Sequence, residues 1–354
     1  MSEAGPTVEE LFKGQGTKPG VAIWDVRSFA LEPLPDKLHG TFYTGDSYLV
    51  LRTYKQDDET EKLLHDIHFW IGAESSQDEA GCVALFAMQL DDFLGGSPVQ
   101  HRQVQQQEDA EFRMLFPKMT YKRGGRHASG FKHAEADAKG PTRMYQIRSP
   151  SVNAIQVFEV PLSVDSLCQS DSYVLEVPTN DVVYLWQGSA TNIREKIKSR
   201  DVATSMRMDS GTMKMSVVDS DDISSTDAVA FFELLGCSSP ADASIKDADQ
   251  DKGTPREKGV AVAPKMFRCS EGAAPVALGE PSRAALADEG QFAVMTSRCV
   301  WVWTGSLAGK PALARAFASG SAVLAAEGQP AAFPVRCVKA GWEPNAFAEA
   351  FPDW

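Results

Sequence analysis

The sequence is organised as three copies of one short pattern. In each copy a strand-like run is followed by a second run that ends in Trp-x-Gly: GDSYLVL with IHFWIG, SDSYVLEV with VVYLWQG, and GQFAVMT with CVWVWTG. The three tryptophans, Trp70, Trp186 and Trp303, follow one another at intervals of 116 and 117 residues. Two nearly equal intervals predict one domain of roughly that length, repeated three times along the chain.

The runs within each copy have the character of buried strands. Residues 48–51 and 182–185 are short, β-branched or aromatic, and bounded by turn residues. Their near-continuous apolarity is typical of central strands that are covered on both faces. Helical patterns follow in the first two copies, over residues 77–94 and about 192–208. The expected unit is a sheet sandwiched between helices, in the α+β class.

Two polar, turn-rich stretches divide the chain. One covers residues 135–141 and ends in Gly-Pro, and the other covers 238–259 and is rich in Ser, Asp, Lys and Pro without periodicity. They predict domains at 1–139, at 140–258 including a C-terminal linker, and at 259–354. The third copy is rich in alanine and is the most divergent of the three.

The charge balance restricts the classes of partner. The 354 residues include 35 basic and 48 acidic side chains, for a net charge of −13. This balance disfavours non-specific binding to DNA or RNA, where affinity comes mainly from neutralising phosphates. It is compatible with a divalent cation as ligand. The sequence contains no GxSxG, P-loop, HExxH or GxGxxG motif, so we do not expect an enzyme.

Targeting signals and cysteine spacing favour the cytoplasm. No apolar run approaches the roughly 18 residues needed to span a bilayer, and the N-terminal stretch is polar and acidic, unlike a signal peptide. The six cysteines are widely scattered and form no CxxC pair. We therefore expect a cytoplasmic protein with neither a structural zinc site nor a disulfide framework.

Residues 18–133 resemble the first domain of the gelsolin/villin superfamily, in order and in spacing. The matching stretches are Gly20-Val-Ala-Ile-Trp-Asp-Val, Phe42-Tyr-Thr-Gly-Asp-Ser-Tyr, His68-Phe-Trp-Ile-Gly, Ser76-Gln-Asp-Glu-Ala-Gly, Gln89-Leu-Asp-Asp-Phe-Leu-Gly-Gly, Val99-Gln-His-Arg and Gly130-Phe-Lys-His. The second copy matches through Glu159-Val-Pro, Asp171-Ser-Tyr and Trp186-Gln-Gly, and the third through Trp303-Thr-Gly and a C-terminal Phe-x-x-x-Phe-Pro-x-Trp. Three copies, rather than six, resemble the severin and fragmin branch.

The resemblance implies three tandem domains, each a central mixed β-sheet between a long and a short helix. It implies a calcium-dependent actin-binding protein, monomeric when free and associated with the cytoskeleton, that severs filaments and caps barbed ends. The alternative is calcium-dependent capping or monomer binding without severing. The family places an arginine pair shortly before Glu-Val-Pro, whereas this chain has Arg148-Ser-Pro-Ser-Val-Asn there.

The resemblance places a first calcium ion in the first copy. Its ligands would be the carbonyl of Gly45, the carboxylate of Asp46, a bidentate Glu79, and a carbonyl just after Gly124-Gly125, assigned to Arg126. Calcium takes six to eight oxygen ligands and mixes carboxylates with backbone carbonyls, so these residue types suit it. Without the resemblance, Gly-Asp is also a common turn dipeptide, and a glutamate near a helix start also complements the helix dipole.

A second ion is implied at Asp91, with the carbonyls of Gly96 and Pro98. In the family an actin carboxylate completes this site, so the ion would lie in the interface with actin. The residues alone also fit a second interpretation, in which Asp91 and Asp92 are solvated charges at the end of a helix.

The second copy retains a calcium pair and the third does not. Asp171 and Glu195 match Asp46 and Glu79, with Ser170 in place of the glycine before the aspartate. In the third copy Gly290 stands where the aspartate should be, and Ser-Leu-Ala-Gly-Lys-Pro-Ala-Leu-Ala-Arg after Trp303-Thr-Gly contains no carboxylate. We expect the third copy to lack the site, unless a shifted register brings in Asp288 or Glu289.

Helix 77–94 is predicted to present two different faces. At 100° per residue, five apolar side chains fall on one face that should pack on the sheet: Val83, Phe86, Leu90, Phe93 and Leu94. Leu85 and Met88 fall outside it, beside Gln89 and Asp92, and are expected to be exposed. Exposed apolar side chains among polar ones suit a protein interface, although a neighbouring copy covering them would explain them as well. The resemblance assigns this helix to actin.

Two basic regions complete the candidate sites. Lys196, Lys198 and Arg200 on the second long helix are candidates for filament contact in place of the missing arginine pair. Between the first two copies, a basic segment matches the one that the family uses for phosphoinositide head groups, and a solvated or actin-facing loop is an equally good interpretation. Its candidate residues are Lys118, Lys122, Arg123, Arg126 and Lys132, with His127 and His133 nearby.

Overall fold

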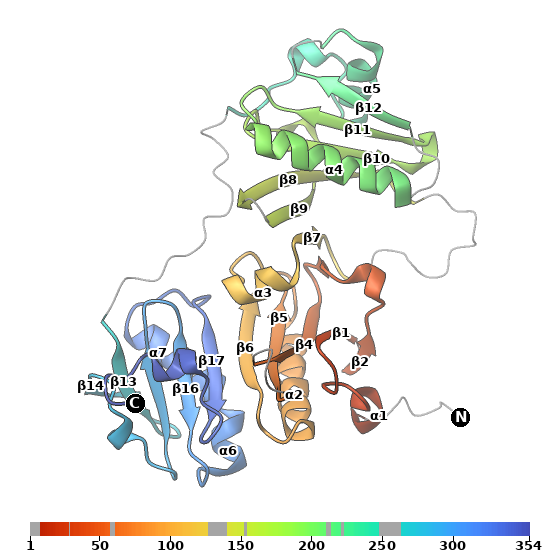
Figure 1. The fold of residues 1–354 in the computed structure, drawn as a ribbon. Coiled ribbons are helices and arrows are strands. Elements are labelled where there is room, and N and C mark those ends of the chain that lie inside the picture. Colours follow the sequence, from red (N-terminus) through yellow and green to blue (C-terminus); the bar gives the residue numbers. More distant parts are fainter. Residues whose placement is uncertain are drawn as a thin grey trace. The chain divides into compact units, whose positions relative to one another are not determined.

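The computed structural model describes residues 8–27, 29–56, 61–126, 140–151, 154–209, 214–220, 223–247 and 263–354. They divide into two compact units (Figure 1). The first unit holds the described residues within 1–39, 45–115 and 256–354, and the second holds those within 40–44 and 116–255. Among the helices described, none is both long enough and apolar enough to cross a membrane.

A ten-stranded sheet forms the centre of the first unit, in the order β14-β13-β15-β16-β17-β6-β5-β4-β1-β2. The strands from the first copy are β1 Gly20–Arg27, β2 Ala30–Pro33, β4 Ser47–Lys55, β5 Leu63–Ile71 and β6 Val99–Val104. The strands from the third copy are β13 Lys265–Cys269, β14 Val276–Gly279, β15 Gln291–Met295, β16 Val300–Thr304 and β17 Val335–Lys339. The two halves of the sheet meet where β17 pairs antiparallel with β6.

Helices cover both halves of this sheet. They are α1 Val8–Phe12, α2 Gln77–Phe93, α3 Ala110–Leu115, α6 Gly309–Ala314, α7 Ala316–Ala326 and α8 Asn345–Ala348, with 3-10 turns at Asp36–Leu38 and Arg283–Ala285. In the first copy α2 packs on the apolar face of β4 and β5. In the third copy α7 covers one face and α8 the other.

The second unit is a seven-stranded sheet in the order β12-β11-β10-β8-β9-β7-β3. Its strands are β3 Thr41–Tyr43, β7 Lys118–Lys122, β8 Arg143–Ser151, β9 Ala154–Val160, β10 Ser172–Val177, β11 Val182–Gln187 and β12 Lys214–Asp219. Its helices are α4 Ile193–Asp209 and α5 Thr226–Leu234, with 3-10 turns at Val164–Ser166, Pro178–Asn180 and Pro240–Asp242. The long α4 packs on one face and the short α5 on the other, as predicted (Figure 1).

The hairpin that ends in Trp-x-Gly is built identically in all three copies. The cross-strand pairs are Tyr48 with Trp70, Tyr173 with Trp186, and Phe292 with Trp303. Each tryptophan is buried, and the paired ring centroids lie 5.6, 5.7 and 6.0 Å apart. In each copy the next strand, β6, β12 or β17, pairs parallel with the tryptophan strand. The predicted α+β repeats are therefore confirmed.

The glycine of Trp-x-Gly is required by close backbone packing. A Cβ atom built on Gly188 would lie 2.3 Å from the carbonyl oxygen of Gln169, and one on Gly305 would lie 2.2 Å from that of Asp288. No side chain fits at such a distance, because the neighbour is rigid backbone. In the second and third copies the motif therefore marks where the tryptophan strand passes against the turn that precedes its partner strand.

Helix α2 begins and ends where its sequence dictates. Ser76 caps the helix by accepting the N–H of Glu79, whose carboxylate accepts the N–H of Ser76 in return. Gly95 and Gly96, with φ of 77° and 78°, follow its last turn. One expectation about its packing was wrong, because Phe93 is 42% exposed. Its ring lies 5.9 Å from that of Phe12 in α1 rather than on the sheet.

The two sheets combine strands from different copies, so they do not coincide with the three copies read from the sequence. The third copy continues the sheet of the first, and β3 and β7, which belong to the first copy in sequence, lie in the sheet of the second. The predicted domain boundaries, at 139/140 and 258/259, involve residues outside those described and stay predictions.

A buried charged network lies beside the β6–β17 seam. His101 lies 3.5 Å from Asp66 and 3.7 Å from Asp109, and its ring stacks on that of His68 at 4.4 Å. Arg336 of β17 reaches Asp109 at 3.2 Å and so joins the third copy to this network. Burial alone would lower the pKa of His101, but the two carboxylates outweigh it and raise the pKa to about 9. Burial, then the charge of His101, lowers the pKa of His68 to about 3.

The two pKa shifts predict that His101 and His68 change the free energy of unfolding with pH in opposite directions. The folded pKa of His101 lies above its unfolded value of about 6.5, so its contribution is complete below pH ~6.5 and is lost as the pH rises through 9. The folded pKa of His68 lies below that value, so the free energy of unfolding falls as the pH drops from ~6.5 toward 3. Each slope should reach at most about 1.4 kcal/mol per pH unit.

Urea denaturation across pH checks this. His101→Gln should flatten the alkaline slope, and His68→Gln should flatten the acidic one. Parallel curves for the wild type and His101→Gln between pH 6.5 and 9 would contradict the assignment of a charged His101.

Candidate functional site

The outward face of α2 carries the residues expected to be exposed. Leu85 is 60% exposed, and Gln89 and Asp92 are exposed, as expected, whereas Met88, which was also expected to be exposed, is half-buried. The opposite face, with Val83, Phe86, Ala87 and Leu90, is buried in the core of the first copy. A large apolar side chain therefore stands in solvent on a helix that is otherwise packed.

Asp91 is not a solvated charge at the end of the helix. It is 2% exposed, and its Oδ2 accepts a hydrogen bond from the Lys339 ammonium at the end of β17. Its Oδ1 is buried and accepts no hydrogen bond of ordinary geometry, although the Gln100 side chain lies close enough to act on the pKa. Burial raises the pKa of Asp91, against the opposing effect of Lys339. A buried carboxylate with an orphaned oxygen fits a cation ligand.

Gly96 and Pro98 lie next to this carboxylate. The N–H of Gly96 donates to the carbonyl of Asp91 at 2.8 Å, and Pro98 is buried immediately before β6. A Cβ atom built on Gly96 would lie 2.9 Å from Lys339 Nζ. The ammonium group therefore sits against two of the three residues predicted to hold the second ion.

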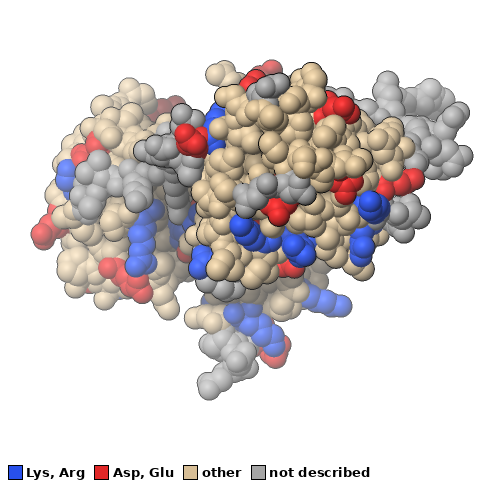
Figure 2. All heavy atoms as spheres, turned by 90° about the horizontal axis from the view of Figure 1, so that it is seen from above, with Lys and Arg blue, Asp and Glu red and all other residues tan. Residues whose placement is uncertain are grey.

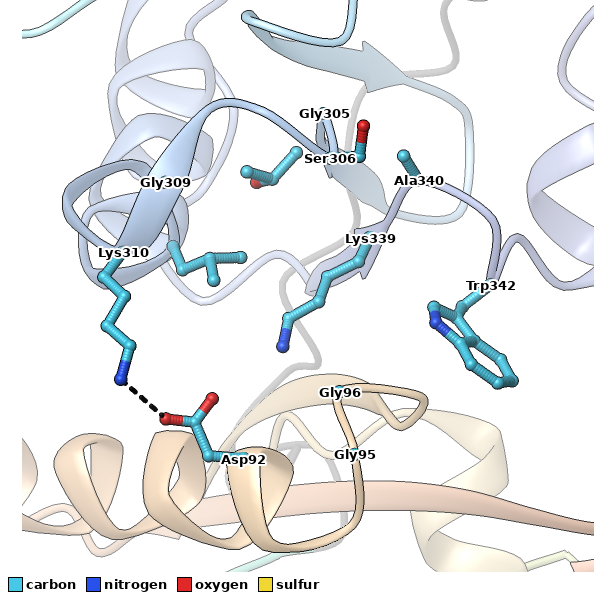
Figure 3. A pocket seen from close by; sticks show the side chains of 12 residues that line it. Asp92, Gly95, Gly96, Gly305, Ser306, Gly309, Lys310, Lys339, Ala340 and Trp342 are labelled. Atoms are coloured by element: carbon cyan, nitrogen blue, oxygen red, sulfur yellow. Dashed lines mark ion pairs between the residues drawn. The ribbon is translucent and has the colours of Figure 1, made fainter.

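A pocket of 640 Å³ opens beside this site, between the end of α2 and the third copy (Figure 3). Its third-copy wall includes Lys310, Lys339 and Trp342, and its first-copy wall includes Asp92, Gly95 and Gly96. Lys310 forms an ion pair with Asp92 at 3.6 Å. Lysines of the third copy thus meet adjacent aspartates of α2.

The acids predicted for the first calcium site lie immediately before β4 and in the first turn of α2. The Ser47 and Ser75 hydroxyls, 2.8 Å apart, tie the start of β4 to the residue before the α2 cap. The Glu79 carboxylate accepts from the N–H and hydroxyl of Ser76, so part of its capacity serves the cap. Asp46 is half-buried and accepts from the Tyr48 hydroxyl at 3.3 Å, and Gly45 lies directly before it. Arg126 belongs to the second unit, so its carbonyl as a ligand stays a prediction.

In the second copy two carboxylates and an arginine converge. Asp171 is buried, accepts from the Gln146 amide at 2.7 Å and lies 3.6 Å from the Arg148 guanidinium. Glu195 accepts from the backbone N–H of Ser149 at 3.2 Å. Burial raises the pKa of Glu195, and the charge of Asp171 raises it further. Two acids that repel each other at partial burial suit a divalent cation.

Ser170 occupies the position before this aspartate. The Ser170 hydroxyl lies 3.2 Å from Cys168 Sγ. The group of Ser170 that is proposed to bind a metal is its backbone carbonyl. The carbonyl of Asp171 is used otherwise, because it accepts from Gly188 and from the Thr191 hydroxyl.

One hydrogen bond fixes the alignment of the three copies. The glycine of Trp-x-Gly donates its N–H to the carbonyl of Asp46 in the first copy, of Asp171 in the second and of Gly290 in the third. Gly290 therefore occupies the position of the ligand aspartates. Asp288, the alternative acid, accepts from the Ser306 hydroxyl at 3.0 Å.

Sequence reasoning missed the basic partners of these acids. Lys339, Lys310 and Arg148 each contact a candidate acid, but only carboxylates and carbonyls were sought as ligands. It also missed two acid–histidine clusters in the described residues, Asp66–His68–His101 and His101–Asp109–Glu111. The second already contains Arg336, which donates to Glu111 at 3.0 Å. No spacing in the sequence signals these contacts, because the contacts of Lys339, Lys310 and Arg336 join different copies and the others join separate elements within one copy.

The basic candidates differ in their availability. Lys118 and Arg123 are exposed on and beside β7, and Arg126 is half-buried. Burial, then the charge of Arg143, lowers the pKa of Lys122. Lys132 lies outside the described residues. Lys196 and Lys198 on α4 are half-buried. On the face drawn in Figure 2, basic side chains lie in small groups among acidic and uncharged ones.

Comparison with known proteins identifies the family. The gelsolin repeat profile matches residues 28–113 and 153–222. The chain is 32% identical over 346 residues to "Actin depolymerising venom protein gelsolin 1" of Platymeris rhadamanthus, covering 96% of this chain and 90% of that protein. It is 32% identical to gelsolin of Drosophila melanogaster, covering 97% of this chain and 43% of that protein. It is 31% identical to villin-2 of Arabidopsis thaliana, covering 98% of this chain and 34% of that protein.

The chain therefore belongs to the gelsolin family, as the sequence predicted, and this family membership confirms the expectation that it is not an enzyme. It spans less than half the length of the Drosophila and Arabidopsis relatives. Among solved structures, a Thorarchaeota 2DGel3 in complex with rabbit actin covers 60% of this chain and 98% of its own, at 21% identity. Its TM-score of 0.24 is too low for a comparison of folds.

Removing single carboxylates should show how much each predicted calcium site contributes to the stability gained from calcium. At calcium 100 times the dissociation constant, each occupied site should raise the free energy of unfolding by about 2.7 kcal/mol. Asp46→Ala and Glu79→Ala should each remove the first-copy share of this increase, and Asp171→Ala the second-copy share, because the remaining oxygens are too few to replace the ion's water.

Denaturation with and without calcium measures the increment, and calorimetric titration counts the ions. Asp78→Ala is the matched control, since it removes an exposed acid from the same turn of α2 as Glu79. Unchanged ion counts in the Asp46 and Glu79 variants would contradict the ligand assignment.

Proposed function

We propose that this protein is a calcium-dependent actin-binding protein that severs filaments and caps their barbed ends. The observation that carries the proposal is the outward face of α2, where Leu85 is 60% exposed beside Met88 and Gln89. The family supports it, and the relative that this chain covers to 90% is named for depolymerising actin. With actin as partner, the protein would act in the cytoplasm, at the cytoskeleton.

The α2 face has the properties of an interface. Fully burying a leucine or methionine side chain gains about 1.5–3 kcal/mol, so two such side chains supply a useful part of a binding energy. The polar neighbours Gln89 and Asp92 provide the rim that interfaces usually have. The rigid packing of the opposite face holds the helix in place before binding, which limits the entropic cost.

Calcium dependence is proposed from the state of the acids. Asp91 is held by Lys339, and Asp171 and Glu195 share the neighbourhood of Arg148. In each case the protein's own basic group compensates carboxylates that calcium would otherwise hold. Calcium is therefore expected to change these contacts, and with them the surface offered to actin.

Capping or monomer binding without severing is the second candidate, and Arg148 favours it. Its guanidinium lies 3.6 Å from Asp171 and 5.9 Å from the Phe158 ring, so it faces the unit itself. On α4, Ile193 and Ile197 are 78% and 57% exposed, while Lys196 and Lys198 are half-buried. The filament contact would then be apolar as much as basic.

Phosphoinositide head groups are a further proposed ligand of the second unit. Lys118 and Arg123 are exposed, and cations with free donors bind phosphate. Lys122 is less suited, because burial lowers its pKa and its ammonium lies 6.0 Å from the Tyr43 ring. Competition between these lipids and actin would follow if the two surfaces overlap.

Replacing Leu85 and Met88 by aspartate should weaken binding to monomeric actin at least tenfold. The exposed helix face would lose its apolar contacts and gain charges that must be desolvated, while the core stays intact. Affinity is measured with labelled actin in the presence of calcium. Met114→Asp is the matched control, because Met114 is a 79% exposed apolar side chain on α3 of the same copy. Normal binding by the double variant would refute the α2 assignment.

Microscopy of labelled filaments distinguishes the two candidates. Severing predicts calcium-dependent breaks along filaments, and capping alone predicts stalled barbed ends without breaks. If neither appears with calcium, while monomers are still bound, the protein is a monomer-binding member of the family.

A further inference from the structure

The chain that precedes β1 packs against the last turn of α2. Residues 8–17, named here the N-terminal strap, consist of α1 and a turn in which Gly14 and Gly16 have φ of 80° and 74°. Glycine adopts such angles without steric cost, so the chain can turn tightly after α1. The Thr17 hydroxyl closes this turn by donating to the Gly14 carbonyl at 2.8 Å. In Figure 1 α1 lies at the same end of the first unit as α2.

Phe12 is the apolar anchor of the strap. Its side chain is fully buried in the core of the first copy. Its ring meets that of Trp24 on β1 edge to face at 5.4 Å and lies 5.9 Å from that of Phe93, the last residue of α2. Phe12 therefore joins the end of the helix to the sheet from a separate segment of the chain.

Gly16 brings the backbone of the strap against the same end of α2. A Cβ atom built on Gly16 would lie 2.7 Å from Leu94 Cδ2, and its positive φ would strain any other residue. His65 of β5 donates from Nε2 to the Gly16 carbonyl at 2.9 Å. The strap is thus fixed to the sheet on one side and touches the helix end on the other.

The last turn of α2 is poorly supported by its own sequence. It contains Asp91 and Asp92 but no basic side chain, although the C-terminal end of a helix favours cations. Lysines of the third copy compensate these charges. The apolar residues at the end, Phe93 and Leu94, are exposed and half-buried respectively, so the contacts that the strap gives them form much of their packing.

We infer that the N-terminal strap positions the surface proposed to bind actin. Phe12 and Gly16 hold the last turn of α2, and with it Gln89 and Asp92 on the outward face, in the orientation that actin binds. Because Phe12 is fully buried, it acts on the partner only through the helix. The inference rests on the proposed function. If a variant kept this turn in place only a tenth of the time, its apparent affinity for actin would fall about tenfold.

Phe12→Ala in the full-length chain tests both parts of the inference. Without actin, hydrogen exchange at the amides of residues 90–94 should become about tenfold faster, while exchange at residues 81–85 stays unchanged. With calcium, the affinity for labelled monomeric actin should fall about tenfold. Phe12→Leu, which keeps an apolar side chain in the core, should restore both quantities to within about threefold of the wild type.

Phe112→Ala is the matched control. Phe112 is also a fully buried phenylalanine of the first copy, but it lies on α3, and its ring packs 5.3 Å from that of His68. Its loss removes the same core volume without touching the strap. Exchange in α2 and actin affinity should both stay at the wild-type values. If Phe112→Ala weakens actin binding as much as Phe12→Ala does, general destabilisation explains the effect and the inference is wrong.

Gly16→Ala keeps the inference testable if Phe12→Ala does not fold. It leaves the Phe12 ring in the core and pushes a methyl group against Leu94, so it should change exchange and affinity in the same directions. The variant with Leu85 and Met88 replaced by aspartate separates the two possible failures. If it binds actin normally, the α2 surface is wrong and the inference falls with it. If it loses binding while the Phe12 and Gly16 variants bind normally, only the inference is refuted.

Discussion

Backbone hydrogen bonding between β6 and β17 makes one sheet out of two copies that lie more than 200 residues apart in sequence. In the ion pairs across this seam, the first copy supplies the acids and the third the bases: Asp91, Asp92, Asp109 and Glu111 against Lys339, Lys310 and Arg336. Apolar contact adds to it, because the Phe69 and Phe317 rings meet edge to face at 4.6 Å. The buried members of these pairs depend on one another, since a carboxylate left alone in this environment would be costly.

The second unit also contains buried carboxylates, but a basic group of the same copy compensates their charge. Burial and the charge of Asp171 raise the pKa of Glu195, and Arg148 supplies the compensating charge from β8 of the same copy. In the first unit the compensating charge at Asp91 comes from another copy. The contact of Arg148 therefore stays within one copy, whereas the contact of Lys339 joins two copies.

The hairpins explain why the copies diverge in site residues and still keep one fold. The aromatic–tryptophan pair recurs in all three copies, and Gly188 and Gly305 pack against backbone in the second and third. The aspartate position needs only a carbonyl to accept the glycine N–H, and Gly290 supplies that as well as Asp46 does. The fold therefore tolerates loss of the carboxylate in the third copy, whose basic side chains instead form ion pairs with the first copy.

The sequence by itself determined the parts that depend on local pattern. Periodicity and the capping pair Ser76 and Glu79 defined α2, the Trp-x-Gly spacing predicted three copies, and the matching stretches over residues 18–133 indicated the family. The faces of α2 were predicted except at Phe93, whose partner Phe12 comes from a separate helix, and at Met88, which is half-buried rather than exposed. Only the tertiary structure decided that Asp91 is buried and held by Lys339, because that contact joins residues 248 positions apart. A helical pattern records which side chains share a face, but the partner across a sheet seam is set by strand pairing, and strand pairing between copies leaves no periodic signal in the chain.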